Sequence, residues 1–465
     1  MTFPRDFTWG VATSSYQIEG HAMGGGRGAS VWDEFCATPG RVNGGHTGAV
    51  SCDHYHHYAS DVQLMRDLGL RAYRFSVAWS RVMPTGRRPV NAAGLAFYDR
   101  LVDSLLEARI EPWLTLFHWD YPLALYREGG WLHPDSPRWF ADYTRVIVDK
   151  LSDRVRHWMT LNEPQCFIGL GHQTGIHAPG DKLPLDRTLL AAHHTLLAHG
   201  LAVQTIRSRA KLPPVIGWAP TGDVPTPATD CPEDIAAARE TFWRVPADNT
   251  WNMAWWLDPV MRGRYPEQGL HAYGAAAPAF TDAEMRTIHQ PIDFIGLNLY
   301  RGYDCRRGAD GSPENLTSTP GTPATHNHWN LHPAALRWGP FFTHERYGLP
   351  VVITENGMAA HDWVSLDGEV HDPQRTDFLA RYLMELRRAV RDGVRVKGYF
   401  AWSLLDNFEW SEGYRYRFGL VHVDYATQRR TPKDSAWWYG ECARTNGASL
   451  PAAAPARSLQ PAGRA

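Results

Sequence analysis

The sequence lacks the features that mark nucleic-acid-binding and membrane proteins. Its 47 Lys and Arg residues are balanced by 49 Asp and Glu residues, for a formal net charge of −2. This leaves no basic excess for a nucleic acid or an acidic surface. It contains no run of about 18 apolar residues that would span a membrane. Its N-terminus shows no basic segment followed by an apolar core, so no signal peptide is expected. We therefore expect a cytoplasmic protein with no nucleic-acid or membrane partner.

The chain also lacks CxxC motifs and nucleotide-binding loops. Its six cysteines are scattered without a CxxC motif, which predicts free thiols in a reducing compartment and leaves disulfides as the alternative. The Gly-rich stretch 24–28 has no Gly-Lys-Ser/Thr ending. A P-loop requires that ending, so we interpret the stretch as a loop between barrel elements. The cysteines are Cys36, Cys52, Cys166, Cys231, Cys305 and Cys442.

Aromatic residues, by contrast, are abundant. The chain has 20 Trp, 19 Tyr and 17 Phe among 465 residues. Part of this set will form the core, but such an excess also suits a protein that stacks against the flat apolar faces of sugar rings. The length exceeds that of an ordinary small domain and fits a large α/β barrel with loop insertions.

Short apolar runs alternate with longer amphipathic segments along most of the chain. The expected strands are 7–13, 71–77, 111–117, about 159–163, 215–219, 291–298, 351–355 and 397–402. The expected helices include 54–68, 92–108, 136–151, 187–209 and 372–393. For the third of these helices, Ser136 is the expected N-cap and Pro137 the first helical residue.

This alternation predicts parallel strands joined by crossover helices. About eight strands favour a closed (β/α)8 TIM barrel with elaborated loops at its C-terminal face. The alternative is a doubly wound open sheet, but that fold usually carries a phosphate or dinucleotide loop after an early strand. We expect one domain over residues 1–446, a long loop over about 304–336, and a disordered Pro/Ala-rich tail over 447–465. The chain is expected to be a monomer or a homo-oligomer.

Two of the predicted strands end in a glutamate beside an asparagine and a chain breaker. Glu163 lies in Asn162-Glu163-Pro164, and Glu355 precedes Asn356-Gly357. Catalytic groups of TIM barrels sit at the carboxyl ends of strands. On our numbering these are strands four and seven, so the two side chains can face each other across the barrel mouth.

A pair of carboxyl groups is what glycosidic-bond hydrolysis requires. One protonates the leaving oxygen, and the other attacks the anomeric carbon or activates water. A separation of about 5–5.5 Å gives retention through a covalent intermediate, and about 6.5–9.5 Å gives inversion. The alternative is that both are ordinary glutamates at strand ends, which the repeated Asn and chain breaker make a weaker interpretation.

The chain resembles glycoside hydrolase family 1, the β-glucosidase family, from about residue 3 to 439. The motifs that carry the resemblance are Thr160-Leu161-Asn162-Glu163-Pro164, Ile353-Thr354-Glu355-Asn356-Gly357, the N-terminal stretch 7–20 and the C-terminal stretch 402–410. The resemblance implies a retaining β-glucosidase that also accepts β-galactosides or β-fucosides. Its expected substrates are small β-glycosides and short β-linked oligosaccharides, with no cofactor.

The resemblance also assigns catalytic roles. Glu163 matches the acid/base and Glu355 the nucleophile, so their environments should push the two pKa values apart. Arg74 is the expected cation beside Glu355, because it shares the inward face of its strand with Ala72 and Ser76. Tyr300 is the expected phenolic donor.

Further positions match sugar contacts of the family. Trp402 is the expected floor under the glucose ring, and Trp329 matches the aromatic residue on the leaving-group side. Family members that act on 6-phosphorylated sugars usually have a small residue at the position of Trp410, so this tryptophan argues for unphosphorylated glycosides. The remaining expected substrate contacts are Gln17, His118, Trp119, Asn162, Asn298, Glu409 and Phe418.

Some patterns were weighed as metal sites. Asp53 to His57 and the pair His193-His194 have metal-like spacing, but both fall in expected helices and the family uses no metal. We expect no metal site.

The competing functions are a 6-phospho-β-glycosidase, a transglycosylase of the same family, and a sugar-binding barrel without catalysis. The last is disfavoured because both glutamates are present.

Overall fold

Eight parallel strands form the centre of the protein. The computed structural model describes residues 2–451. The strands follow the order β5-β4-β3-β2-β1-β11-β10-β7, with every neighbouring pair parallel. Their bounds are β1 Thr8–Ala12, β2 Ala72–Ser76, β3 Glu111–Phe117, β4 His157–Asn162, β5 Val215–Ala219, β7 Ile295–Asn298, β10 Val351–Asn356 and β11 Val396–Trp402.

The two end strands, β5 and β7, meet and close the barrel. The Asp293 amide donates to the Ile216 carbonyl at 2.7 Å, and the Asn298 amide donates to the Pro220 carbonyl at 3.0 Å. Thr221 and Asn298 also form a parallel bridge. The predicted (β/α)8 barrel is confirmed, and the open-sheet alternative is wrong.

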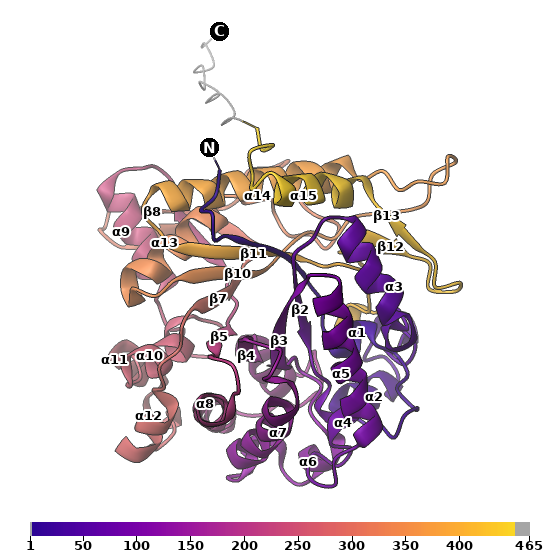
Figure 1. Cartoon of the computed structure of the whole chain (residues 1–465). Helices are drawn as coiled ribbons and strands as arrows, with labels where there is room; N and C mark the ends of the chain where they lie inside the picture. The colour runs from indigo at the N-terminus through magenta and orange to yellow at the C-terminus, as the bar shows by residue number, and fades with distance from the viewer. Residues whose placement is uncertain (1, 452–465) are drawn as a thin grey trace.

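The main helices pack around the outside of the strands (Figure 1). One boundary differs from the prediction: the third expected helix begins at Ser136 itself, with Asp135 as its N-cap. Pro137 is then the second helical residue, a position whose N–H has no partner in the helix, so proline is tolerated there. The larger helices are α3 His54–Asp67, α5 Ala92–Glu107, α7 Ser136–Leu151, α8 Leu185–Arg209, α9 Pro232–Phe242, α10 Ala254–Arg262, α13 Ala335–Tyr347, α14 Pro373–Arg391 and α15 Asp434–Arg444.

Shorter elements build the loops. The short helices are α1 Ser15–Ile18, α2 Val31–Ala37, α4 Trp79–Val82, α6 Leu123–Arg127, α11 Glu267–Tyr273 and α12 Asp282–Ile288. A π-helix runs over Gln165–Gln173, directly after Glu163, and a two-stranded sheet joins β12 Val421–Val423 to β13 Arg430–Pro432. Short 3-10 helices lie at Asn43–Gly45, Gly130–Leu132, Gly274–Ala276 and Trp410–Glu412.

The segment expected as a long loop over 304–336 is partly regular. It contains most of β8 Gly302–Arg307, all of β9 Pro313–Asn315 and the first residues of α13. β8 pairs with β6 Val224–Pro227 from far earlier in the chain. The loop prediction was wrong here because the pairing partner of β8 lies about 80 residues away, beyond the reach of local periodicity.

The barrel interior is packed below the mouth. Trp113, Met159, Phe294, Val352 and Phe400 are buried together there. Large side chains from several strands fill the interior, as in other barrels of this size, so it forms a floor and not a pore. The larger apolar core lies between the strands and the surrounding helices.

The two ends of the described chain lie side by side (Figure 1). The Phe3 amide donates to the Asn446 carbonyl at 3.1 Å. Beyond residue 446, Leu450 is buried and the Pro451 carbonyl accepts from Arg387 at 2.8 Å. Residues 452–465 of the predicted tail lie outside the described residues.

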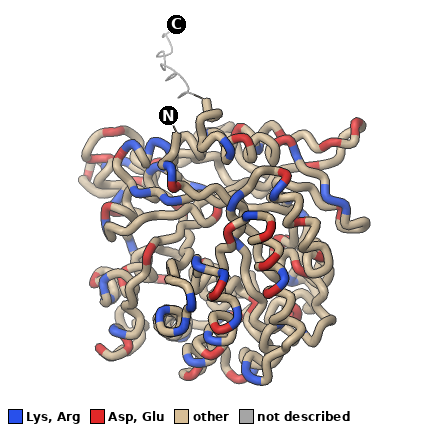
Figure 2. Tube along the Cα trace, in the orientation of Figure 1, with Lys and Arg blue, Asp and Glu red and all other residues tan. Residues whose placement is uncertain are grey.

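Charged residues of both signs are mixed along the chain trace (Figure 2). Within residues 2–451, no helix combines the length and the apolar character that crossing a membrane would require.

Candidate active site

A cavity of about 550 Å³ opens where the barrel strands end. Glu163 follows β4, Glu355 lies near the end of β10, and Trp402 ends β11. Ten of the residues expected from the sequence line this cavity: His118, Trp119, Glu163, Tyr300, Trp329, Glu355, Trp402, Glu409, Trp410 and Phe418.

The four other expected residues stand directly behind the wall. Arg74, Asn162, Asn298 and Gln17 are buried, and each hydrogen-bonds to a residue that lines the cavity. The structure therefore brings all of the expected residues to one place, some at the surface of the cavity and some as supports.

Glu163 lies in a pocket of weak donors. Asn298 Nδ2 donates to its Oε1 at 2.7 Å, and the Cys166 thiol donates to its Oε2 at 3.1 Å. Its backbone has a φ of +45°, a strained conformation for a residue with a side chain. The Glu163 amide donates to the Ala219 carbonyl of β5 at 2.7 Å, which holds this conformation.

Glu355 has stronger partners. Arg74 forms a buried ion pair with its Oε1, and the Tyr300 hydroxyl donates to its Oε2 at 2.6 Å. Arg74 Nη1 also donates to the Thr354 carbonyl at 3.0 Å, so the guanidinium is fixed against β10. A charge-assisted bond and a short phenolic bond both favour the ionised carboxylate.

These surroundings separate the two carboxyl groups. Burial, followed by the neighbouring charge of Glu355, raises the pKa of Glu163 to about 8. Burial also raises the pKa of Glu355, but the Arg74 guanidinium and the Tyr300 hydroxyl oppose that effect. When the pair holds one proton, the proton therefore resides on Glu163.

An amide network ties the two glutamates together. Asn162 Oδ1 accepts from Arg74 Nη2 at 2.5 Å and from Asn298 Nδ2 at 2.9 Å. Asn162 Nδ2 donates to His118 Nε2 at 3.1 Å. Burial and the nearby Arg74 charge hold the pKa of His118 well below its usual range, so its ring is neutral and Nε2 can accept. Because Arg74 and Asn298 share the Asn162 oxygen, the positions of Glu355 and Glu163 are linked.

Indole rings form one wall of the cavity. Trp410 packs against Trp119 with ring centroids 4.5 Å apart and against Trp32 at 4.6 Å. Trp402 stacks on the His118 ring at 5.7 Å. Trp119 and Trp410 have φ values of +78° and +53°. Such strained residues cluster at functional sites, where the surrounding packing enforces them.

Glu409 is a third carboxyl group in the same cavity. Gln17 Nε2 approaches its Oε2 at 3.4 Å and donates to the Phe408 carbonyl at 2.9 Å. Burial, followed by the charges of Glu355 and Glu163, raises the pKa of Glu409 to about 8. Its two oxygens remain suited to adjacent hydroxyl groups of a ligand.

The opposite end of the cavity contains residues that were not expected. Arg301 pairs with Asp223 and lies over the Trp329 ring at 5.4 Å. Apart from Trp329, no residue of this end was expected, because the end is assembled from separate loops. Other unexpected lining residues are Cys166, Leu170, Ile176, His177, Thr221, Gly222, Trp251, Asn327, Ser411, Glu412 and Tyr416.

Cys166 could have been recognised. It follows Glu163 by three residues where a helical turn begins, so the spacing alone places its thiol beside the carboxylate. This spacing was not among the patterns that predicted the site.

The motifs with metal-like spacing have other partners. His54 Nδ1 pairs with Asp61 at 2.7 Å, and His56 Nδ1 pairs with Asp53 at 2.6 Å. His193 Nδ1 contacts the Tyr265 hydroxyl at 2.9 Å.

Comparison with known proteins shows the family of this chain. The sequence profile described as Glycosyl hydrolase family 1 matches residues 1–448. A 1,4-beta-D-glucan glucohydrolase of Thermotoga neapolitana is 42% identical over 96% of this chain and 99% of its own length. Beta-glucosidase A of Acetivibrio thermocellus is also 42% identical, over 96% and 99%.

Solved structures share the fold of this chain. The Thermotoga maritima beta-glucosidase in complex with glucoimidazole has a TM-score of 0.88 at 42% identity and covers 96% of this chain and 99% of its own. The same enzyme in complex with galacto-hydroximolactam gives 0.87 at 41%, with 96% and 99% covered. With the paired glutamates of the barrel mouth, these matches show that the chain belongs to glycosyl hydrolase family 1.

Proposed function

We propose that this glycosyl hydrolase is a retaining β-glucosidase that removes terminal β-D-glucosyl residues by double displacement. The observation that carries the proposal is the unequal pairing of two buried glutamates in one cavity. Glu355 has a cation and a phenol, whereas Glu163 has an amide and a thiol. Relatives named beta-glucosidase and glucan glucohydrolase support the substrate class.

In the first step, Glu355 attacks the anomeric carbon and Glu163 protonates the departing glycosidic oxygen. The bond to the aglycone breaks as the ester bond to Glu355 forms. In the second step, water replaces the ester, and the Glu163 carboxylate takes the proton that the water loses. Each step inverts the anomeric carbon, so the product retains the β configuration. Arg74 and Tyr300 keep Glu355 ionised for the attack.

The sugar end of the cavity fits an uncharged glucose. Glu409 and Gln17 supply hydroxyl contacts, with His118 beside them and Trp402 as an apolar floor. Asn162, directly behind the wall, is the proposed partner of the 2-hydroxyl, where hydrogen bonds tighten in the transition state. β-Galactosides and β-fucosides are proposed secondary substrates, since a relative binds a galacto-configured inhibitor.

Charge disfavours the 6-phospho-β-glycosidase alternative. Glu409 offers a phosphate a carboxyl group and no positive charge. Among the described residues that line the cavity, the single arginine is Arg301, and it is paired with Asp223. Trp410 fills the adjoining wall. A phosphate would therefore be desolvated beside carboxyl groups without a free cation.

A panel of aryl β-glycosides tests the proposal. We expect kcat/KM for the β-glucoside to exceed that for its 6-phosphate by at least about 10²-fold, because a charged group would be buried unpaired. Proton NMR should show the β anomer of glucose forming first. A preference for the phosphorylated substrate, or the α anomer as first product, would overturn the proposal. Product analysis at high acceptor concentration separates hydrolysis from transglycosylation.

A further inference from the structure

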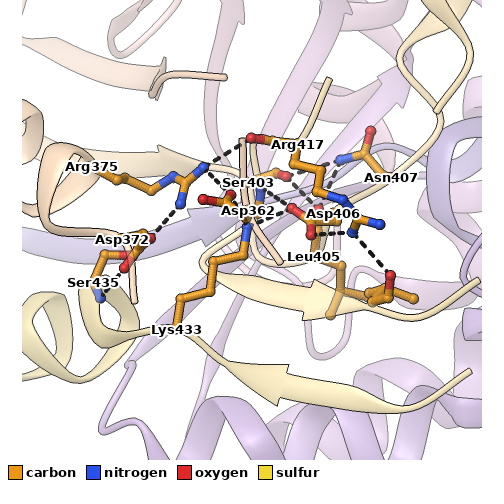
Figure 3. A network of polar contacts seen from close by, with 12 residues as sticks. Asp362, Asp372, Arg375, Ser403, Leu405, Asp406, Asn407, Arg417, Lys433 and Ser435 are labelled. Carbon is orange, nitrogen blue, oxygen red and sulfur yellow. Dashed lines mark hydrogen bonds and ion pairs between the residues drawn. The ribbon is translucent and has the colours of Figure 1, made fainter. Parts of the chain in front are cut away.

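A cluster of six charged side chains includes residues that are close in sequence to Glu409 and Phe418 of the cavity (Figure 3). Its carboxylates are Asp362, Asp372 and Asp406, and its cations are Arg375, Arg417 and Lys433. Three negative and three positive formal charges cancel. Lys433 and Asp406 have no side-chain exposure, and none of the six lines the cavity. The cluster therefore cannot act on a substrate by contact.

Lys433 and Asp406 form the centre of this cluster. Lys433 Nζ lies 2.7 Å from Asp406 Oδ1 and 2.6 Å from Asp362 Oδ2. Arg417 Nη1 lies 2.7 Å from Asp406 Oδ2. Asp406 thus has a cation on each oxygen, and it is held from two separate parts of the chain.

Asp406 fixes both ends of the segment that carries the sugar contacts. We define the sugar loop as residues 403–418, which includes Glu409, Trp410 and Phe418. Asp406 Oδ1 accepts from the Gly419 amide at 2.9 Å, and its Oδ2 holds Arg417, beside Phe418. The Asp406 amide donates to the Val421 carbonyl at 2.9 Å. This carboxylate therefore joins the two ends of the loop, in addition to the backbone hydrogen bonds that Ser403 makes with Phe418 and Leu420.

A chain of hydrogen bonds continues from Asp406 to the cavity. The next residue, Asn407, donates to Ser403 Oγ at 2.9 Å and accepts from Gln17 Nε2 at 3.0 Å. Gln17 Nε2 is 3.4 Å from Glu409 Oε2. A shift of Asp406 would therefore move Asn407, and with it the Gln17 amide and the Glu409 carboxylate.

Stability alone does not account for such a cluster. Taking charged groups out of water is costly, and apolar side chains of similar volume often stabilise a fold equally well. What a buried ion network can add is a single defined geometry. At the sugar end that geometry is needed, because small misplacements of binding groups reduce transition-state stabilisation.

We propose that Asp406, with Lys433 and Arg417, is a positioning unit that sets Glu409 and Gln17 for the glucose hydroxyls. The inference rests on the proposed β-glucosidase function and deepens it. It assigns recognition of the sugar to residues that never touch it.

Asp372 provides a matched control. It is a buried carboxylate of the same cluster, paired with Arg375, and it accepts from Ser435 Oγ at 2.6 Å. None of the hydrogen bonds of the Asp372 side chain reaches the sugar loop. Asp406→Asn and Asp372→Asn each remove one buried negative charge, but only the first removes a carboxylate that bonds directly to the loop. Asp372 reaches the loop one step further away, through Arg375 Nη2, which donates to the Arg417 carbonyl at 2.9 Å.

The experiment compares these two variants with wild type on an aryl β-glucoside and on its deoxy analogues, each lacking one hydroxyl. For Asp406→Asn we expect kcat/KM to fall by up to about 10²-fold, mostly through a higher KM. The loss should shrink on the analogue that lacks the hydroxyl bound by Glu409. Asp372→Asn should lower the melting temperature with KM unchanged.

The double variant Asp406→Asn/Lys433→Met separates the effect of the loop geometry on KM from the effect of the cluster's net charge on stability. It restores the formal neutrality of the cluster, so its melting temperature should rise above that of Asp406→Asn, while KM stays high. Arg417→Met should also raise KM, because it removes the other cation paired with Asp406. Since Arg417 is partly exposed, this variant replaces Asp406→Asn in the experiment if Asp406→Asn does not fold.

Equal KM values for wild type, Asp406→Asn and Arg417→Met, with shifts only in melting temperature, would overturn the inference. A wild-type enzyme without β-glucosidase activity would instead overturn the proposed function, so the two failures are distinguishable.

Discussion

The ends of β4 and β10 carry the same type of residue in two different environments. Glu355 at the end of β10 is held by Arg74 and by the Tyr300 hydroxyl. Glu163, after β4, has the Asn298 amide and the Cys166 thiol. Both carboxyl groups are buried to a similar degree, so burial does not distinguish them. The two carboxyl groups differ in their hydrogen-bond donors, and above all in the Arg74 guanidinium beside Glu355. We infer that these donors decide which carboxyl group carries the proton.

Removing the Glu355 carboxylate should have the largest effect. Glu355→Gln eliminates the proposed nucleophile, and we expect kcat to fall by about 10⁴-fold or more on every aryl glucoside, whatever its leaving group. Steady-state kinetics on a series of phenols of different acidity will measure this. Residual rates that depend on the leaving group would show that Glu355 is not the attacking residue.

The corresponding change at Glu163 should behave differently. Glu163→Gln removes the proton donor, so kcat/KM should fall by about 10²–10⁴-fold for poor leaving groups. It should fall far less for an acidic phenol, which departs without protonation. The same leaving-group series is the measurement, with Glu355→Gln as its control. A uniform loss across the series would contradict the assigned role.

The pH profile sharpens the comparison. Glu163 must be protonated to donate, and its pKa is raised to about 8. The kcat/KM of wild type should therefore fall as pH rises through about 8, and on the acid side as Glu355 gains its proton. With an acidic phenol as leaving group, kcat/KM of Glu163→Gln should no longer fall because Glu163 loses its proton. Any decrease in kcat/KM that remains at high pH is then assigned to Glu409, whose pKa is also raised to about 8. If kcat/KM of the variant fell at high pH as it does in wild type, Glu163 would not be the proton donor.

Tyr300→Phe weakens the Glu355 environment alone. Loss of a donor to the ionised form raises the pKa of Glu355, so the acid limb should move to higher pH while the basic limb stays. A single hydrogen bond to a charged group contributes about 1.5–3 kcal/mol, which bounds the loss in kcat/KM at about 10–10²-fold. Movement of the basic limb instead would place the effect on Glu163.

Cys166→Ala should have the smallest effect of these variants, and this effect should be on Glu163. The thiol bond favours the ionised form of Glu163. Its loss should shift the basic limb to higher pH, by less than one unit because a thiol is a weak donor. Cys36→Ala, at a buried thiol that does not line the cavity, is the control. An acid-limb shift in Cys166→Ala alone would contradict the contact seen here.

Sequence patterns predicted most of the barrel and the residues at its mouth. The alternation of strands and helices located all eight barrel strands, because each run is long enough to show its period. Strand alternation also indicated the inward direction of Arg74. These features depend on residues that are close together in the sequence.

What escaped prediction depends on contacts between distant segments. The pairing of β8 with β6 has no local signal. The Asp406 cluster joins residues from 362 to 433 through side chains alone, so no single motif contains it. At the leaving-group end, the resemblance predicted Trp329 but not Arg301 over its ring, because this end is assembled from several loops whose positions periodicity does not set.

Trapping the covalent intermediate tests the central claim most directly. A 2-deoxy-2-fluoro glucoside with a good leaving group should label the enzyme, because the fluorine slows the second step more than the first. Mass spectrometry of the digested protein should then find one 2-deoxy-2-fluoroglucosyl adduct on the peptide that contains Glu355. An adduct on the peptide of Glu163, or no adduct from an enzyme that turns over normally, would contradict the account.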